Sequence, residues 1–408
     1  MSSIKKTTAN SNYDYVVVGA GLTGLSLASL LSQRGLRVAL LDGSDVYGGN
    51  NRSVETRIGS FNNGLRFLPG TENSAKAIGI LELLLETSLS AKNLDLPPVT
   101  FEEGSLRPFL GFGNQPPKFY DEINYFLCHS SIQTLVEPHE WSTLLFNRFT
   151  GDFFPNSHVT RFNCANGLVT SVLVNGQKTL TGAKFVFCGT PKTLQTLIAD
   201  EFFSNRAKQR LNKSVGWTGV CLDILHGQFV SSEMALHLLN GTTQDDIGPC
   251  VGRFFPSCEL DGKSVQYSQW LSFISAEDAE ETELTGNLLK KMKRQIKRAY
   301  PNAFDGVISE RISVAQDLAG TVDLKLNSNL SIPGLPNLFV VNGKMHTERN
   351  LVGMLLQVEK FLLENGQSLT ADSHPVRGLA ETDFVEDADS LMPSQQMPLI
   401  QSKDSEAI

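Results

Sequence analysis

Three glycines near the N-terminus have the spacing that binds a dinucleotide. They are Gly19, Gly21 and Gly24, and they follow directly on an apolar run, residues 15–18, that is typical of a buried parallel strand. Gly19 permits a tight turn, Gly21 lacks the Cβ that would keep backbone away from phosphates, and Gly24 lets a helix lie close to the strand. We therefore expect a pyrophosphate at this turn.

The elements after the glycines complete the nucleotide site. A helix is predicted from Leu22 to about Arg34. Leu22 and Thr23 begin its first turn, whose free N–H groups and positive dipole end face the anion. A second strand, residues 37–41, ends on Asp42, whose carboxylate is placed to accept hydrogen bonds from a ribose 2′-OH and to repel a 2′-phosphate. This order of elements is more specific than the glycines alone, and it leaves FAD and NAD open as the ligand.

The composition narrows the class of protein. The chain has 408 residues, enough for two domains, and a formal net charge of −8. A basic run, residues 288–301, has apolar residues at helical spacing and predicts a solvated amphipathic helix, so no nucleic-acid partner is expected. The six cysteines are scattered, and the sequence has no secretory signal, long apolar segment or metal-ligand spacing. These features predict a cytoplasmic protein with no integral membrane segment and no metal.

A second glycine pair follows Asp42 within VYGGNNRS, residues 46–53. The strand, turn and helix together with this pair resemble the FAD-binding start of the amine oxidase, protoporphyrinogen oxidase and phytoene desaturase superfamily. In that superfamily the double glycine and the residues after it line the FAD pyrophosphate and ribityl chain. The resemblance therefore implies FAD as the cofactor, with Gly49, Asn50 and Arg52 among its contacts.

Two later segments extend the resemblance. SFNNGLRFLPG, residues 60–70, stands where such proteins pass the flavin ring, which implies Gly64, Leu65 and Arg66 as neighbours of the isoalloxazine. A surface or ion-paired arginine is an equal interpretation of Arg66. Residues 157–197 resemble the middle FAD segment of the superfamily, in which a valine at the position of Val159 clamps the adenine through its backbone.

The C-terminal part of the chain resembles the last FAD motif of the superfamily. A strand, residues 338–341, and a helix from about Asn350 to Leu363 are predicted, and the resemblance points the helix N-terminus at the flavin C2 carbonyl. It implies Gly343, Asn350 and Leu351 as cofactor contacts. Asn342-Gly343 stands where Gly-Asp is usual, so the ribityl contact of the aspartate is missing.

The catalytic residues are not identified by any motif, and three side chains are the candidates. Arg66 falls in the flavin-ring segment, while His346 and Arg349 immediately precede the flavin-facing helix. A histidine there would shuttle a proton near neutral pH. Helix capping and salt bridging by the same segment is an equal alternative.

The expected fold is α/β, with a Rossmann-type, glutathione-reductase-like FAD-binding domain and an inserted β-rich substrate domain. Strands are predicted at residues 217–225 and 265–274 of the insert, and core packing is favoured over substrate contact for its Trp217, Tyr267 and Trp270. The predicted ranges are 13–85, 155–214 and 305–366 for the FAD-binding domain, 86–154 and 215–304 for the substrate domain, and 367–408 for a disordered acidic tail.

The predicted function is that of an amine oxidase-like, FAD-dependent oxidoreductase. It would take a hydride from a C–N or C–C bond of a small-molecule substrate. One alternative is a non-redox flavoenzyme resembling UDP-galactopyranose mutase, because Gly49-Asn50 and Gly343-Lys344 resemble pairs in those mutases. Another is a non-catalytic FAD-binding protein. The electron acceptor and the oligomeric state stay open.

Overall fold

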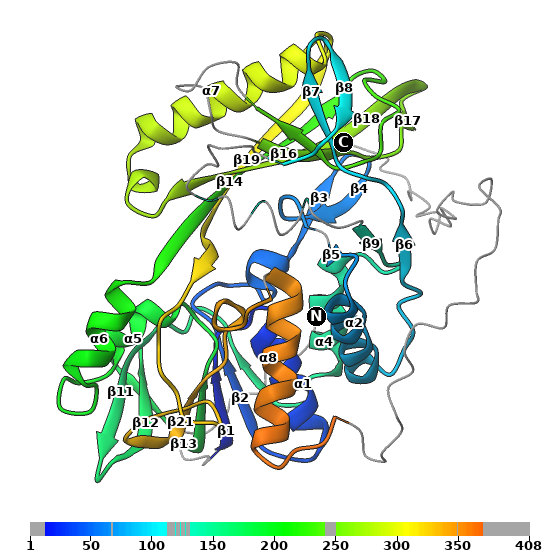
Figure 1. Cartoon of the computed structure of the whole chain (residues 1–408). Coiled ribbons are helices and arrows are strands. Elements are labelled where there is room, and N and C mark those ends of the chain that lie inside the picture. The colour runs from blue at the N-terminus through cyan, green and yellow to red at the C-terminus, as the bar shows by residue number, and fades with distance from the viewer. Residues whose placement is uncertain are drawn as a thin grey trace, which may run out of the picture. The chain divides into compact units, whose positions relative to one another are not determined.

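The computed structural model describes residues 13–66, 68–111, 119, 123, 127, 131–240, 250–348 and 350–369 (Figure 1). The chain divides into two compact units, residues 1–376 and 377–408, and the second lies wholly outside the described residues. The disordered tail predicted for 367–408 also lies outside them, apart from residues 367–369.

The first sheet has eight strands and carries the glycine-rich turn. Its order is β10-β2-β1-β13-β12-β11, with β21 beside β13 and β20 beside β21. β1 is parallel to β2 and β13, and β13 is parallel to β21, as in a Rossmann-type sheet. The strands are β1 (Tyr13–Val18), β2 (Val38–Leu41), β10 (Asp152–Phe154), β11 (Val159–Ala165), β12 (Leu168–Val174), β13 (Lys178–Phe187), β20 (Ser331–Ile332) and β21 (Leu335–Val340).

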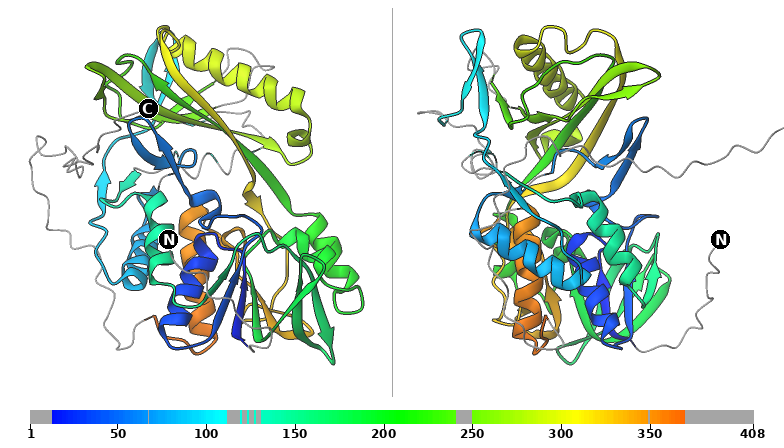
Figure 2. Two further views of the ribbon diagram at one scale, coloured as in Figure 1. Left: turned by 180° about the vertical axis from the view of Figure 1, so that it is seen from behind. Right: turned by 90° about the vertical axis from the view of Figure 1, so that its right-hand side faces the viewer.

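Side chains alternate between the two faces of this sheet. Val17 and Leu40 enter one apolar cluster, whereas Val16 and Leu41 enter another. The helices α1, α2, α4 and α8 contribute to the first cluster, and Figure 2 shows them beside the sheet. These helices are α1 (Leu22–Gln33), α2 (Glu72–Leu85), α4 (Pro138–Arg148) and α8 (Asn350–Glu364), and two shorter ones are α5 (Leu194–Leu197) and α6 (Asn205–Asn212).

The second sheet also has eight strands, in the order β19-β14-β18-β16-β15-β7-β8, with β17 beside β18. Helix α7 (Thr282–Ala299) lies along one face of this sheet (Figure 1). There Met292 and Ile296 pack in the same buried apolar cluster as Trp270. The core interpretation of Tyr267 and Trp270 is confirmed, since both are buried. The strands are β7 (Val99–Glu102), β8 (Ser105–Pro108), β14 (Val215–His226), β15 (His237–Leu239), β16 (Cys250–Phe254), β17 (Cys258–Leu260), β18 (Lys263–Ser275) and β19 (Val307–Thr321).

Small elements connect the larger ones. A hairpin leads into the predicted flavin-ring segment, three short strands form a small sheet, and the described residues contain four 3₁₀ turns. They are β3 (Ser53–Thr56), β4 (Gly59–Asn62), β5 (Leu68–Pro69), β6 (Lys92–Leu94), β9 (Ser131–Gln133), η1 (Gly49–Asn51), η2 (Pro191–Thr193), η4 (Asp278–Glu280) and η5 (Gly343–Met345).

Strand pairing departs from the predicted domain ranges at two places. β19 falls in the range predicted for the FAD-binding domain, 305–366, but pairs with β14 in the second sheet along most of its length. Conversely, α4 and β10 fall in the range 86–154, predicted for the substrate domain, but α4 packs on α1 and β10 pairs with β2. Both differences arise from long-range pairing, which local sequence patterns do not encode.

One amide side chain joins two strands that are not neighbours in the first sheet. Asn337 of β21 accepts a hydrogen bond from the Val169 N–H (2.9 Å) and donates to the carbonyls of Val169 (2.8 Å) and Ala183 (3.1 Å). The side chain thereby reproduces the paired bonds of a strand partner.

Asn337→Ala should lower the free energy of unfolding by about 1–3 kcal/mol, because the main-chain groups of Val169 lose both partners. Urea unfolding measures the change. Thr160→Ala is the matched control: it removes a single exposed bond to the Leu173 carbonyl (3.2 Å) and should cost less than about 0.5 kcal/mol. Equal losses in the two variants would contradict the bridging role.

Candidate functional site

The predicted glycine turn has the geometry that its spacing indicates. Gly19 has a φ of +105°, in the region that favours glycine. A Cβ on Gly24 would lie 1.8 Å from the Gly19 carbonyl oxygen, so helix α1 approaches the turn with no side chain between them. A Cβ on Gly21, in contrast, would meet no atom within 4 Å. Space is therefore open in front of Gly21, at the N-terminus of α1.

The second glycine pair contacts the first turn directly. The Gly48 N–H donates to the Ala20 carbonyl (2.8 Å), and Gly21 and Gly48 form an isolated parallel bridge. A Cβ on Gly49 would lie 3.3 Å from the Gly21 Cα. Any larger residue at 49, which has a φ of +54°, would push the two loops apart.

Asp42 lies at the carboxyl end of β2, beside the same turn. Its Oδ2 accepts from the Ala20 N–H (2.6 Å) and its Oδ1 from the Ser44 N–H (2.8 Å), which fixes the carboxylate. The Ser157 N–H donates to the Asp42 carbonyl (2.7 Å), so Val159, the first residue of β11, follows close behind. The structure thus brings Asp42 and Val159 to one end of the sheet, although neither lines the two cavities described next.

Two cavities meet at Asn50. The first, which we call the central cleft, has a volume of about 200 Å³ and is lined by residues 21–23, 48, 50–51, 66, 188–190, 316–320, 342–344, 350–351 and 354. The second, which we call the side cavity, has a volume of about 420 Å³ and is lined by residues 44, 46, 49–50, 52, 63 and 311–314. Of the predicted cofactor contacts, Gly21, Leu22, Thr23, Gly343 and Leu351 line the central cleft, whereas Gly49 and Arg52 line the side cavity.

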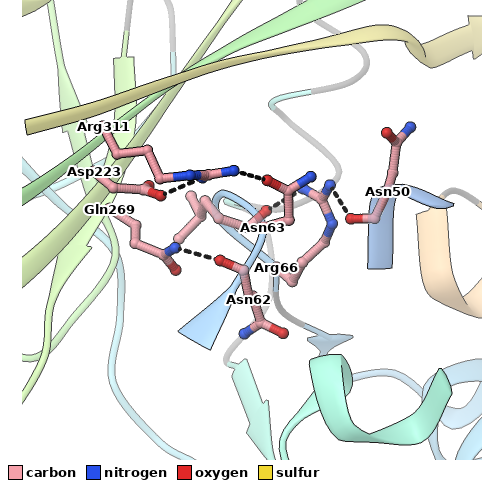
Figure 3. Close-up of polar contacts among 8 residues, drawn as sticks. Asn50, Asn62, Asn63, Arg66, Asp223, Gln269 and Arg311 are labelled. Carbon is pink, nitrogen blue, oxygen red and sulfur yellow. Dashed lines mark hydrogen bonds and ion pairs between the residues drawn. The ribbon is translucent and has the colours of Figure 1, made fainter. Parts of the chain in front are cut away.

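Arg66 lies in the wall of the central cleft and is 8% exposed, so the surface interpretation is wrong. Its Nη1 donates to the Leu65 carbonyl and its Nη2 to the Asn50 carbonyl, each at 2.8 Å (Figure 3). Burial lowers the pKa of its guanidinium, and the nearby carboxylate of Asp223 opposes that shift. The backbone carbonyls thus hold a cation at the cleft.

Side chains of the second sheet hold the segment that contains Arg66. Gln269 donates to the Asn62 carbonyl (2.8 Å), and Arg311 donates to Asn63 (2.5 Å) and to Asp223 (3.0 Å), as Figure 3 shows. Asp223 is 1% exposed, and burial raises its pKa to about 6 although Arg311 lowers it.

A close backbone contact accompanies these polar contacts. A Cβ on Gly64, which has a φ of +77°, would lie 2.4 Å from the Cys221 sulfur of β14. The next residue, Leu65, is 2% exposed and packs in the apolar cluster that contains Cys221. Gly64 and Leu65 therefore lie directly against the second sheet.

The C-terminal segment closes the other side of the central cleft. Asn342 donates to the Gly189 carbonyl (2.9 Å) and accepts from the Lys344 N–H (2.9 Å). The Lys344 ammonium forms an ion pair with Asp317 of β19. At the start of α8, Asn350 lines the cleft, and its buried Nδ2 has no hydrogen-bond partner among the described residues.

Of the other two catalytic candidates, His346 does not join this group. His346 does not line either cavity, its Nδ1 accepts from the Glu348 N–H (3.0 Å), and burial lowers its pKa. The charges that act on it belong to Glu348, Lys360, Lys76 and Glu359, on and beside α2 and α8. Arg349 lies outside the described residues.

Sequence reasoning missed several residues that line the central cleft. Residues 316–320 reach it from β19, and Lys344 reaches it from η5. Lys344 directly follows the predicted contact Gly343, so its position carried a usable signal. No comparable signal marks residues 316–320, because their approach depends on pairing with β14, almost a hundred residues earlier.

Two classes of site find no support in the part of the chain that the structure describes. There, no three histidine, cysteine or acidic side chains gather as metal ligands would. Nor does that part contain a helix with the length and apolar character needed to cross a membrane.

Residues 17–82 match the sequence model of a family described as an NAD(P)-binding Rossmann-like domain. The chain is also similar to the aerobic glycerol-3-phosphate dehydrogenase of Staphylococcus haemolyticus, with 42% identity over 66 residues. That match spans 16% of this chain and 11% of the dehydrogenase. It therefore compares a small part of either protein.

Solved structures resemble most of the chain. A putative protoporphyrinogen oxidase from Exiguobacterium superposes with a TM-score of 0.61 and 9% identity over 88% of this chain and 100% of the other. A putrescine oxidase variant superposes with a TM-score of 0.60 and 11% identity, over 86% of this chain and 97% of the other. A Rab GDI from Plasmodium falciparum superposes with a TM-score of 0.50 and 13% identity, over 88% of this chain and 99% of the other. The expected likeness in fold to a protoporphyrinogen oxidase and to an amine oxidase, here a putrescine oxidase, is thus confirmed, as is the α/β, Rossmann-type architecture.

The raised pKa of Asp223 predicts a pH dependence of stability. Its folded-state pKa of about 6 exceeds the ordinary 3.8, so the folded state holds the proton more tightly. This stabilisation is complete below the ordinary pKa and is lost as the pH rises through the folded value, on the order of 3 kcal/mol in all. Urea unfolding between roughly pH 4 and 7.5 should therefore show wild-type stability falling by about that much relative to Asp223→Asn.

Asp305→Asn provides the control for this measurement, because Asp305 is an exposed carboxylate on the loop before β19. Its pH profile should run parallel to the wild type. A parallel profile for Asp223→Asn would show that Asp223 is not the titrating group.

Proposed function

We propose that the central cleft binds FAD and that the protein is an FAD-dependent oxidoreductase. The observation that carries the proposal is that the N-terminal glycine turn, Arg66 and residues 342–344 and 350–351 line one cleft. These are three of the parts of the chain in which the superfamily resemblance implies cofactor contacts. A plain NAD site needs only the first of them.

The residues present fit this cofactor. The open space at Gly21 accommodates a pyrophosphate against the first N–H groups of α1, where the helix dipole favours negative charge. The unpartnered Nδ2 of Asn350 offers a donor inside the cleft. Asp42 would accept from the adenosine ribose, and the main chain at Val159 would contact the adenine.

Bound FAD would supply the hydride acceptor, while the residues of the chain would bind the cofactor, orient it and stabilise its charge. Arg66 and Lys344 bring two positive charges to the cleft, and Asp317 is the acidic residue among those that line it. This excess of positive charge, with the N-terminus of α8, would stabilise negative charge on a reduced ring. Residues 318–320 are buried in the cleft wall and would exclude water from the ring.

We infer a small-molecule substrate that yields a hydride from a C–N or C–C bond. The support is the fold shared with proteins named putrescine oxidase and protoporphyrinogen oxidase. The sequence similarity to a glycerol-3-phosphate dehydrogenase supports redox chemistry in general, although it covers a small part of that enzyme.

Two other functions each have one observation in their favour. Lys344 lines the cleft directly after Gly343, which favours a non-redox flavoenzyme like UDP-galactopyranose mutase, where a glycine-arginine pair stands. The fold shared with a Rab GDI, a protein that is not named as an oxidase or dehydrogenase, is the observation in favour of a non-catalytic function. The oxidoreductase is preferred because the superposition is better with the proteins named putrescine oxidase and protoporphyrinogen oxidase, at TM-scores of 0.60 and 0.61, than with the Rab GDI.

Gly21→Val should weaken FAD binding by roughly 100-fold or more while leaving the fold intact, because the new side chain occupies space that only a ligand would fill. Binding is measured by the quenching of FAD fluorescence, and the fold by circular dichroism. Gly286→Val on α7 is the matched control, since a Cβ there also meets no atom within 4 Å. If Gly21→Val binds FAD as tightly as the wild type, the pyrophosphate does not bind at this turn.

The visible spectrum distinguishes the oxidoreductase from the other two functions. FAD-loaded protein should lose its flavin absorbance on anaerobic reduction with dithionite and regain it in air. Fast return indicates an oxidase, and substrate candidates containing amines are then screened by their ability to bleach the flavin anaerobically. If the absorbance returns slowly and no substrate candidate bleaches the flavin, the mutase-like or the non-catalytic function is favoured. If no flavin binds, the proposal is contradicted.

A further inference from the structure

Strand β19 has a bulge where it lines the central cleft. It pairs with β14 through Ala315 and Ala319, whose partners Gly219 and Trp217 are two positions apart on β14. One residue of β14 therefore faces three residues of β19. Residues 316–320, which contain the bulge, all line the cleft. Because a bulge bends its strand and re-aims the side chains in it, this irregularity determines which side chains reach the cleft wall.

Asp317 lies at the centre of the bulge and has a strained backbone. Its φ is +52°, in the left-handed region that favours glycine. Gly216 of β14 makes room for its side chain, since a Cβ there would lie 2.8 Å from the Asp317 Oδ1. A backbone of this kind persists where the surrounding structure imposes it, and such residues gather at functional sites. The bulge thus brings one carboxylate, in a strained conformation, to the wall of the cleft.

The carboxylate of Asp317 forms an ion pair with the ammonium of Lys344. Their side chains are 25% and 13% exposed, so the pair is partly shielded from water and its attraction is stronger than that of a surface pair. Lys344 belongs to η5, where its N–H donates to the Asn342 side chain (2.9 Å). The pair therefore connects a strand of the second sheet to the segment that follows β21 of the first sheet, and both residues line the cleft.

The two cations at the cleft differ in their partners. Arg66 donates to the carbonyls of Leu65 and Asn50, which carry no net charge. Lys344 has a carboxylate partner, and Asp317 alone is acidic among the described residues that line the cleft. A lysine ammonium is a point charge on a flexible stem, so its partner determines where the charge lies. Asp317 thus controls both the position of the Lys344 charge and its effect on a ligand in the cleft.

We propose that Asp317 is a positioning residue that acts through Lys344. It holds the ammonium in the wall of the cleft and offsets its charge, and the pair thereby sets the reduction potential of the bound flavin. This inference rests on the proposed function, because it takes the cleft to hold FAD. Lys344 without its partner would stabilise negative charge on the flavin more strongly, whereas Asp317 without its partner would oppose that charge.

The midpoint potential of the flavin in FAD-loaded protein tests the pair. It is measured at one pH by anaerobic reduction in the presence of a reference dye. Asp317→Asn should favour reduced over oxidised flavin by about tenfold, a rise of about 30 mV for a two-electron couple, because Lys344 loses its counter-charge. Lys344→Met should lower the potential by a similar amount, because the Asp317 carboxylate then stays in the cleft unpaired.

Two further variants locate the effect. In the double variant Asp317→Asn/Lys344→Met both charges are absent, so the ratio of reduced to oxidised flavin should return to within about threefold of the wild type. Asp323→Asn is the matched control. It removes a carboxylate from an ion pair with Arg210 that lines neither cavity, and it should leave the potential unchanged.

Opposite shifts that cancel in the double variant support the proposal. Single variants that keep the potential of Asp323→Asn, or that shift it in the same direction, overturn the proposal, because neither result follows from the charges of the pair. If Asp317→Asn does not fold, Asp317→Gly replaces it with the same expected rise, since glycine suits a φ of +52°.

FAD binding separates this inference from the proposed function. A wild-type protein that binds no FAD contradicts both of them. FAD that binds to every variant with an unchanged potential contradicts the role of Asp317 and leaves the proposed function standing.

Discussion

The cleft depends on backbone approaching backbone without a side chain in between. Gly24 meets the carbonyl of Gly19, Gly49 meets the Cα of Gly21, and Gly353 lies where a Cβ would be 2.4 Å from the Glu348 carbonyl. Each contact brings together a loop and a helix terminus, and the N–H groups and dipole of that terminus then face the cleft. Because these approaches leave no room for a methyl group, the shape of the cleft is determined by main-chain geometry, and the lining side chains add charge to it.

Buried charges connect this cleft to the second sheet. Arg66 has backbone carbonyl partners, and Asp223 has Arg311, but neither arrangement fully replaces water, as the raised pKa of Asp223 shows. Removing one partner of such a pair costs more than the pair contributes, because the other charge stays buried. The polar contacts to Asn62 and Asn63 are therefore best understood as specifying where the segment 62–66 lies on the sheet, while apolar burial supplies most of the stability.

The sequence was sufficient for features that local patterns encode. The strand, turn, helix and strand from β1 to β2 were predicted within one or two residues, as was α8, because glycine spacing and apolar periodicity define them. The strand that pairs with β19 could not be predicted, because β-pairing depends on partners far along the chain. For the same reason the ion pair of Lys344 with Asp317 was missed, and His346 was given a place near the flavin that its surroundings on α2 and α8 do not favour.

Helix α8 has a consequence for how the protein is made. Its Leu355, Phe361 and Leu362 belong to the same buried cluster as Leu25 of α1 and Leu81 of α2. The ribosome synthesises α1 and α2 first and α8 some 265 residues after α2, at residues 350–364. Until then the nascent chain exposes the apolar surface that α8 later covers. Folding of the N-terminal half is therefore completed only after the C-terminal half has been translated, and we expect general chaperones to bind the chain during this interval.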